Sequence, residues 1–167
     1  MLEFEKQVGQ LLTQVSALLT ARNWRMATAE SCTGGFIAKC CTDMAGSSDW
    51  FDRAYVAYSY RAKEQMLGVS HDDLIKFGAV SDEIALQMAT GAKKHSQVKV
   101  AVATTGIAGP GGGMDGKPVG LVHFGWCIDE QPEECDAKVF DGDRNSVRQQ
   151  TVLFALEGII SRLDKQS

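Results

Sequence analysis

The chain has 167 residues, of which 44% are hydrophobic and 23% are charged, a composition typical of one ordinary globular domain. The formal net charge is −4 and no block of Lys and Arg occurs, which argues against a nucleic-acid-binding protein. The chain has no run of about 18 apolar residues that could span a membrane, and its charged start does not resemble a secretion signal. We therefore expect one cytoplasmic domain, residues 1–167, without nucleic-acid or membrane partners.

Hydrophobic periodicity predicts helices that alternate with strands. Apolar residues recur at helical spacing between residues 4 and 19, and a first strand is expected at 24–29. The next predicted elements are a helix over 33–44, a strand over 51–60, short helices over 62–67 and 72–77, and a helix capped by Ser81. A strand over 98–105, a glycine-rich loop over 106–118, a hairpin of strands 119–127 and 135–140, and a helix over 143–163 complete the chain. This order predicts the α/β class, a single layered domain with a mixed sheet flanked by helices.

Cysteine and histidine spacing argues against a metal site. The five cysteines, at 32, 40, 41, 127 and 135, have no CxxC spacing, and the histidines at 71, 95 and 123 are isolated from them. Cys40 and Cys41 lie on an apolar helical stripe and are expected in the core. We expect neither a disulfide framework nor a metal or organic cofactor.

The stretch ATAESCTGG, residues 27–35, puts Ser31 where a strand gives way to a helix. Helix amides are expected to point at such a position, and Gly34 and Gly35 leave room for a substrate to approach the backbone. Glu30 is expected to be a hydrogen-bond partner within this turn. The same residues also fit a purely structural helix cap, so the turn alone does not identify a nucleophile.

A nucleophilic serine requires a base. The three histidines fit helix caps, dipole partners or strand positions better than a catalytic triad. Lys63 is the alternative, provided that burial or nearby positive charge keeps it neutral, and the Tyr58 hydroxyl is expected to converge with its amine. A surface lysine beside a sheet tyrosine is the competing interpretation. Cys32 competes with Ser31 as the nucleophile but has no evident imidazole partner in the sequence.

Two further segments suit an anionic group. Thr105 ends a buried strand, and the glycine-rich loop that begins at Gly106 frees backbone amides to face an anion, although it matches neither a Walker loop nor a Rossmann fingerprint. Arg144 and Arg148 lie four residues apart on the inward face of the last helix. They require either an anionic ligand or an acidic partner such as Asp141 or Asp143, and the sequence leaves both alternatives open.

Several motifs together resemble the CinA carboxyl-terminal domain family. They are AESCTGG, AGSSDWFDR, AYSYRAKEQMLGV, GAVS, TTGIAGPGGG, KPVGLV and GDRNSVRQQT, in this order and spacing, from about residue 8 to residue 160. For short members the resemblance implies a nicotinamide-nucleotide amidohydrolase, which converts nicotinamide mononucleotide and water to nicotinate mononucleotide and ammonia in NAD salvage. It implies Ser31, Tyr58 and Lys63 as catalytic residues. It also implies that Thr33, Thr105 and Arg144 belong to the pocket.

The chain departs from the family pattern in two ways. The family commonly reads Tyr-Ser-Asn-Glu-Ala-Lys where residues 58–63 read YSYRAK, and larger relatives carry an amino-terminal molybdopterin-binding-like domain that is absent here, so the short form is expected. The Tyr60-Arg61 departure favours a rival hypothesis, a nucleotide-binding module without catalysis and with a regulatory role.

The resemblance and the residues together predict a mechanism. Ser31 attacks the carboxamide, Lys63 takes and returns the proton, Tyr58 orients or relays, and amides after Ser31 hold the oxyanion. Arg144 and Arg148 are expected to bind the phosphate of the nucleotide, and the loop from Gly106 to close over it. A homo-oligomer, a dimer or higher, is the expected assembly.

Overall fold

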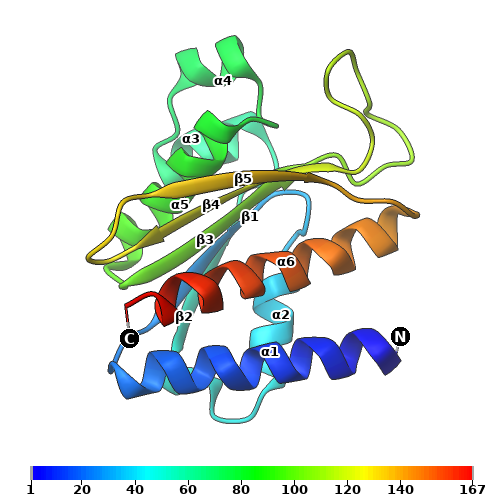
Figure 1. Cartoon of the computed structure of the whole chain (residues 1–167). Helices are drawn as coiled ribbons and strands as arrows, with labels where there is room; N and C mark the ends of the chain where they lie inside the picture. The colour runs from blue at the N-terminus through cyan, green and yellow to red at the C-terminus, as the bar shows by residue number, and fades with distance from the viewer. Residues whose placement is uncertain (1, 167) are drawn as a thin grey trace.

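The computed structural model describes residues 2–166, in which five strands form one sheet in the order β2-β1-β3-β4-β5 (Figure 1). The strands are β1 (Met26–Glu30), β2 (Phe51–Val56), β3 (Val100–Gly106), β4 (Leu121–Ile128) and β5 (Glu134–Val139). The helices are α1 (Leu2–Ala21), α2 (Phe36–Asp43), α3 (Tyr60–Leu67), α4 (His71–Phe77), α5 (Asp82–Ser96) and α6 (Arg144–Asp164), with a 3₁₀ turn, η1, at Ser47–Asp49. None of the helices in this part of the chain is long and apolar enough to cross a membrane.

The sheet combines parallel and antiparallel pairing. β1 pairs in parallel with β2 on one side and with β3 on the other, whereas β3, β4 and β5 pair antiparallel. The predicted mixed sheet and the predicted hairpin of the last two strands are therefore confirmed. Because β1, β2 and β3 are parallel, their carboxyl ends meet at the same edge of the sheet.

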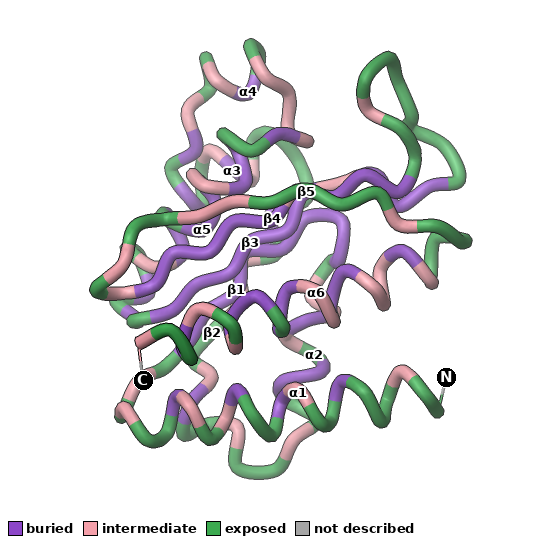
Figure 2. Tube along the Cα trace, viewed as in Figure 1, coloured by how far each residue is buried: buried purple, intermediate pink, exposed green. Residues whose placement is uncertain are grey.

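Helices cover both faces of the sheet, so the protein has two cores. α1, α2 and α6 lie on one face, and α3, α4 and α5 lie on the other (Figure 1). The central strands are buried, whereas β5 is mostly exposed along the edge (Figure 2). Cys40 and Cys41 belong to the core under α1 and α6, as predicted, and all five cysteines are free thiols.

The second strand is shorter than the predicted 51–60. β2 ends at Val56, because the Ser59 hydroxyl accepts a hydrogen bond from the Ala62 amide and caps α3, which begins at Tyr60. Tyr58 therefore lies in the link between β2 and α3 rather than in the sheet. The link, the turn after β1 and the end of β3 all lie at the edge where the parallel strands end.

Candidate active site

Ser31 follows β1 directly, and Lys63 reaches it from the first turn of α3. The Lys63 Nζ lies 2.8 Å from the Ser31 Oγ, and it also donates to the main-chain carbonyls of Ala57 at 3.0 Å and Tyr58 at 3.2 Å. Lys63 is 1% exposed and Ser31 is 8% exposed. The structure thus brings together two residues that lie 32 positions apart in the sequence.

The surroundings of Lys63 raise the share of the neutral amine. Burial lowers the pKa of Lys63 from 10.5 to about 8, and within residues 2–166 no carboxylate is hydrogen-bonded to the amine. A neutral amine has two hydrogens and one lone pair. Two hydrogens suffice for the two carbonyls, which leaves the lone pair free to accept the hydroxyl proton of Ser31. The pair therefore has the geometry of a nucleophile and its general base.

The neighbouring thiol lacks this activation. Burial raises the pKa of Cys32 to about 12, so the thiol stays protonated at neutral pH. This environment favours Ser31 over Cys32 as the nucleophile.

Ser31 and Lys63 open into a cavity of about 290 Å³ at the sheet edge. The cavity is lined by residues of five segments: Ser31, Cys32, Tyr58, Tyr60, Lys63, Ala79, Val80, Thr105, Gly106, Ile107, Ala108, Gly109, Gly111, Gly112 and Arg144. None of these residues is acidic, so the ionisable amine and guanidinium of Lys63 and Arg144 face the cavity without a carboxylate in its wall. Such a site suits an uncharged reacting group attached to an anion.

The expected convergence of the Tyr58 hydroxyl with the Lys63 amine is wrong in its geometry. Lys63 contacts the main-chain carbonyl of Tyr58, whereas the Tyr58 hydroxyl accepts a hydrogen bond from Arg144 at 3.3 Å. Tyr58 is 62% exposed. Its ring therefore lies at the mouth of the cavity, and its hydroxyl has no bond to Ser31 or Lys63 through which it could relay a proton.

Glu30 is fully buried beneath the Ser31 turn. Its carboxylate accepts hydrogen bonds from the hydroxyls of Thr28 and Thr33 and from the amides of Ile37 and Ala38 in the first turn of α2. The expectation that helix amides point at Ser31 is therefore wrong. α2 begins five residues after Ser31, and Glu30 occupies the anion position at its amino terminus. Glu30 is a hydrogen-bond partner of the turn, as predicted.

Three further residues of the turn support it without lining the cavity. The Thr33 hydroxyl is buried and contacts Glu30 and the Thr104 hydroxyl, both at 2.8 Å. Gly34 and Gly35 have φ angles of 58° and 95°, a backbone conformation that favours glycine. Thr33, Gly34 and Gly35 were expected to bind or admit the substrate, whereas none of the three is among the residues that line the Ser31 cavity.

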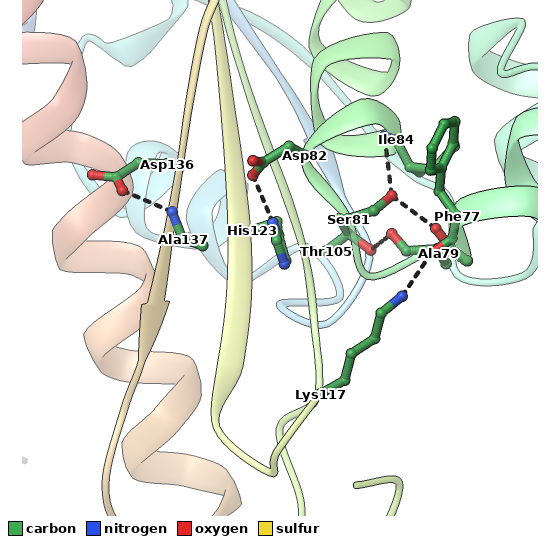
Figure 3. A network of polar contacts seen from close by, with 11 residues as sticks. Phe77, Ala79, Ser81, Asp82, Ile84, Thr105, Lys117, His123, Asp136 and Ala137 are labelled. Carbon is green, nitrogen blue, oxygen red and sulfur yellow. Dashed lines mark hydrogen bonds and ion pairs between the residues drawn. The ribbon is translucent and has the colours of Figure 1, made fainter. Parts of the chain in front are cut away.

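One wall of the cavity includes Ala79 and Val80, from the short segment between α4 and α5. The Thr105 hydroxyl donates to the Ala79 carbonyl at 2.8 Å, and Lys117 donates to the Phe77 carbonyl at 2.6 Å (Figure 3). The Tyr60 hydroxyl accepts from the Ala79 amide at 3.2 Å. Thr105 and Gly106 do line the cavity, but Thr105 directs its hydroxyl at this wall.

Sequence reasoning missed Tyr60 as part of the site. The only signal for Tyr60 was its departure from the family pattern, and the structure shows that this departure leaves the Ser31–Lys63 pair untouched. Arg61 is exposed, and burial rather than this arginine accounts for the lowered pKa of Lys63.

The two arginines of α6 contact main-chain carbonyls. Arg144 donates to the Gly109 carbonyl at 2.8 Å, and Arg148 donates to the carbonyls of Cys32 and Thr33. Within residues 2–166, neither arginine pairs with Asp141 or Asp143, and Asp143 instead caps α6 through the Ser146 amide. The acidic-partner alternative is therefore wrong. Arg144 borders both the Ser31 cavity and a neighbouring one, whereas Arg148 borders only the neighbouring one of these two.

The chain belongs to the CinA C-terminal domain family, whose model matches residues 8–163. It is 45% identical over 153 residues to an Escherichia coli K12 protein named nicotinamide-nucleotide amidohydrolase PncC, covering 92% of this chain and 93% of that protein. A protein of the same name from Enterobacter agglomerans is 46% identical over equal shares. The crystal structure of a competence/damage inducible protein CihA from Agrobacterium tumefaciens is similar with a TM-score of 0.87 and 44% identity, covering 96% of this chain and 95% of that one. No cluster of metal-ligating side chains occurs among the described residues.

Proposed function

We propose that this protein is a nicotinamide-nucleotide amidohydrolase, which hydrolyses the carboxamide of nicotinamide mononucleotide to give nicotinate mononucleotide and ammonia. The observation that carries the proposal is the 2.8 Å contact between the buried Lys63 amine and the Ser31 hydroxyl at the base of a cavity without acidic residues. The relatives that bear this enzyme's name match the chain over nearly its whole length, which supports the same assignment.

The first half of the reaction forms an ester. The Ser31 Oγ attacks the carboxamide carbon while its proton passes to the Lys63 Nζ. The tetrahedral intermediate then collapses: the bond between carbon and nitrogen breaks, Lys63 returns the proton to the departing nitrogen, and ammonia leaves. The nicotinoyl group remains on the Ser31 Oγ, and Lys63 is again neutral.

The second half hydrolyses the ester. Lys63 takes a proton from a water molecule, whose oxygen attacks the ester carbon. The bond from that carbon to the Ser31 Oγ breaks, and Lys63 returns the proton to the serine. The product carboxylic acid ionises and leaves as nicotinate mononucleotide. One amine thus serves as base and acid in both halves.

Backbone amides of the turn are the proposed oxyanion donors. Within residues 2–166, the amides of Cys32 and Thr33 donate no hydrogen bond to the backbone or to another residue's side chain. Amides that follow a nucleophile commonly stabilise the oxyanion. Arg144 at the cavity mouth, together with the Tyr58 hydroxyl that it contacts, is placed to bind the phosphate and orient the nucleotide. Gly106, at the end of β3, lines the cavity, and we propose that it contacts the nicotinamide ring.

The direct test is release of ammonia from nicotinamide mononucleotide by the purified protein and by Ser31→Ala. The proposal expects turnover by the wild type and a loss of at least about 10⁴-fold in kcat for the variant, with nucleotide binding retained. Calorimetric binding of the nucleotide without ammonia release by the wild type would instead favour the non-catalytic nucleotide-binding module.

The proposal includes action in the cytoplasm, a role in NAD salvage and a homo-oligomeric assembly.

A further inference from the structure

The guanidinium of Arg148 lies against the turn that carries Ser31. Its Nε donates to the Cys32 carbonyl at 3.2 Å, and its Nη2 donates to the Thr33 carbonyl at 2.8 Å. The same group lies over the Phe36 ring, 5.4 Å from the ring centroid. One side chain of α6 therefore contacts the two residues after Ser31 and the first residue of α2.

The bond to Cys32 also sets the direction of an amide. A peptide unit is planar and trans, so the Cys32 carbonyl and the Thr33 amide of the same unit point in opposite directions. Because Arg148 holds the carbonyl, it fixes where this amide points. A cation on the carbonyl oxygen also polarises the peptide unit and strengthens its N–H as a donor. The Thr33 amide is one of the two proposed oxyanion donors.

We propose that Arg148 is a positioning residue that holds the Ser31 turn and orients the Thr33 amide toward the oxyanion, and is not a phosphate-binding residue. The inference rests on the proposed function for its kinetic consequences. Arg144, one turn earlier on α6, borders the neighbouring cavity together with Arg148, but of the two it alone also lines the Ser31 cavity and contacts Tyr58 at its mouth, so we assign the phosphate contact to Arg144. Arg148 directs two of its donors at the backbone instead.

Substrates with and without a phosphate separate the two roles. For Arg148→Met, we expect kcat to fall about 10- to 100-fold with both nicotinamide mononucleotide and nicotinamide riboside, because the oxyanion donor is misplaced for both. The ratio of kcat/KM between the two substrates stays within about twofold of the wild-type ratio. In the comparison variant, Arg144→Met, KM rises for the mononucleotide alone and the ratio falls. A fall of the ratio in Arg148→Met like that in Arg144→Met would overturn the proposal.

Two more variants separate positioning from general stability. Arg148→Lys retains one charged donor and should recover part of the lost kcat. Arg162→Met removes another arginine of α6, one that lies over Trp126 at 3.9 Å and donates to the Gly158 carbonyl, far along the helix from the turn. It should lower the melting temperature without lowering kcat. A loss of kcat in Arg162→Met equal to that in Arg148→Met would assign the effect to stability and contradict the proposal.

Hydrogen exchange tests the positioning without any substrate. In Arg148→Met, we expect the amides of residues 31–36 to exchange faster than in the wild type, whereas Arg144→Met leaves them unchanged. If the wild-type protein releases no ammonia from the mononucleotide, the proposed function fails, but the exchange measurement still decides whether Arg148 holds the turn. Unchanged exchange across residues 31–36 in Arg148→Met would overturn the inference.

Discussion

Two buried ionisable side chains flank Ser31, and their surroundings differ. Glu30 lies behind the turn with 0% exposure and accepts four hydrogen bonds, so its carboxylate is fully partnered by the fold. Lys63 lies in front with 1% exposure and has only two carbonyls and the serine hydroxyl as partners. A buried carboxylate whose hydrogen-bonding positions are all filled stabilises the fold around it. A buried amine whose partners are all neutral instead has a lowered pKa and can act as a base.

Of the substitutions at Lys63 and Glu30, Lys63→Met should have the larger effect on activity. Methionine fills the same space without an amine, so kcat should fall by about 10³-fold or more because the base is lost. The free energy of unfolding at pH 7 should not fall, since the substitution removes the cost of burying an amine whose pKa is lowered. Ammonia release and thermal melts check both statements, with exposed Lys94→Met as the control. Retention of more than a tenth of the wild-type kcat would contradict the role of Lys63.

Glu30→Gln should have the opposite profile, a large loss of stability. Each carboxylate oxygen of Glu30 accepts one hydroxyl and one α2 amide, so the amide nitrogen of glutamine would face a donor in either orientation. We expect a loss of about 2–4 kcal/mol in the free energy of unfolding. Denaturant melts measure it, with exposed Glu157→Gln as the control. A loss below about 0.5 kcal/mol would show that the carboxylate does not hold the turn.

The pH dependence should report Lys63. Only its neutral form accepts the serine proton, so kcat/KM should fall tenfold per pH unit below the pKa of about 8 and level off above it. An unfolded lysine keeps its ordinary pKa of 10.5, so the unfolded chain binds more protons between these two values. The free energy of unfolding should therefore rise with pH in this window, and Lys63→Met should lose that rise. Activity independent of pH between about 6 and 8 would contradict the assignment.

Cys32→Ala should give the smallest effect. Burial raises the pKa of this thiol to about 12, so no thiolate is present at neutral pH. We expect kcat to fall less than about fivefold, through the small change in packing beside Ser31. Steady-state kinetics with the mononucleotide test this. Complete loss of activity in Cys32→Ala, with Ser31→Ala still active, would reverse the choice of nucleophile.

Local patterns predicted much of the fold. Segments with the hydrophobic spacing of helices alternate with segments typical of strands, and this order, with the helix cap at Ser81, predicted the layers. The short connection between the last two strands predicted the hairpin. The predicted end of the second strand at Tyr60 was wrong because β2 ends at Val56 and the Ser59 hydroxyl caps α3, a choice that strand propensity does not encode. Local competition between a cap and a strand is decided by packing.

The site was less predictable from the residues because its decisive contacts join distant segments. The residues offered Lys63 as a candidate base for Ser31 but equally as a surface lysine, and only resemblance to a family favoured the base, because no period or spacing places an amine of α3 on a serine after β1. Arg148 reaches Cys32 across 116 positions, so the inward face of α6 was correctly predicted while the partner was not. Tyr58 and Lys63 are close in sequence, yet their side chains diverge.

The central claim is that Ser31 carries the acyl group and Lys63 moves its proton. Acid quenching within the first turnover, followed by mass spectrometry of the peptide that contains residues 30–36, tests it most directly. The account predicts an adduct on the Ser31 oxygen with the mass of nicotinamide mononucleotide minus ammonia, absent from Ser31→Ala. An adduct on Cys32, or full deamidation by Ser31→Ala, would contradict it.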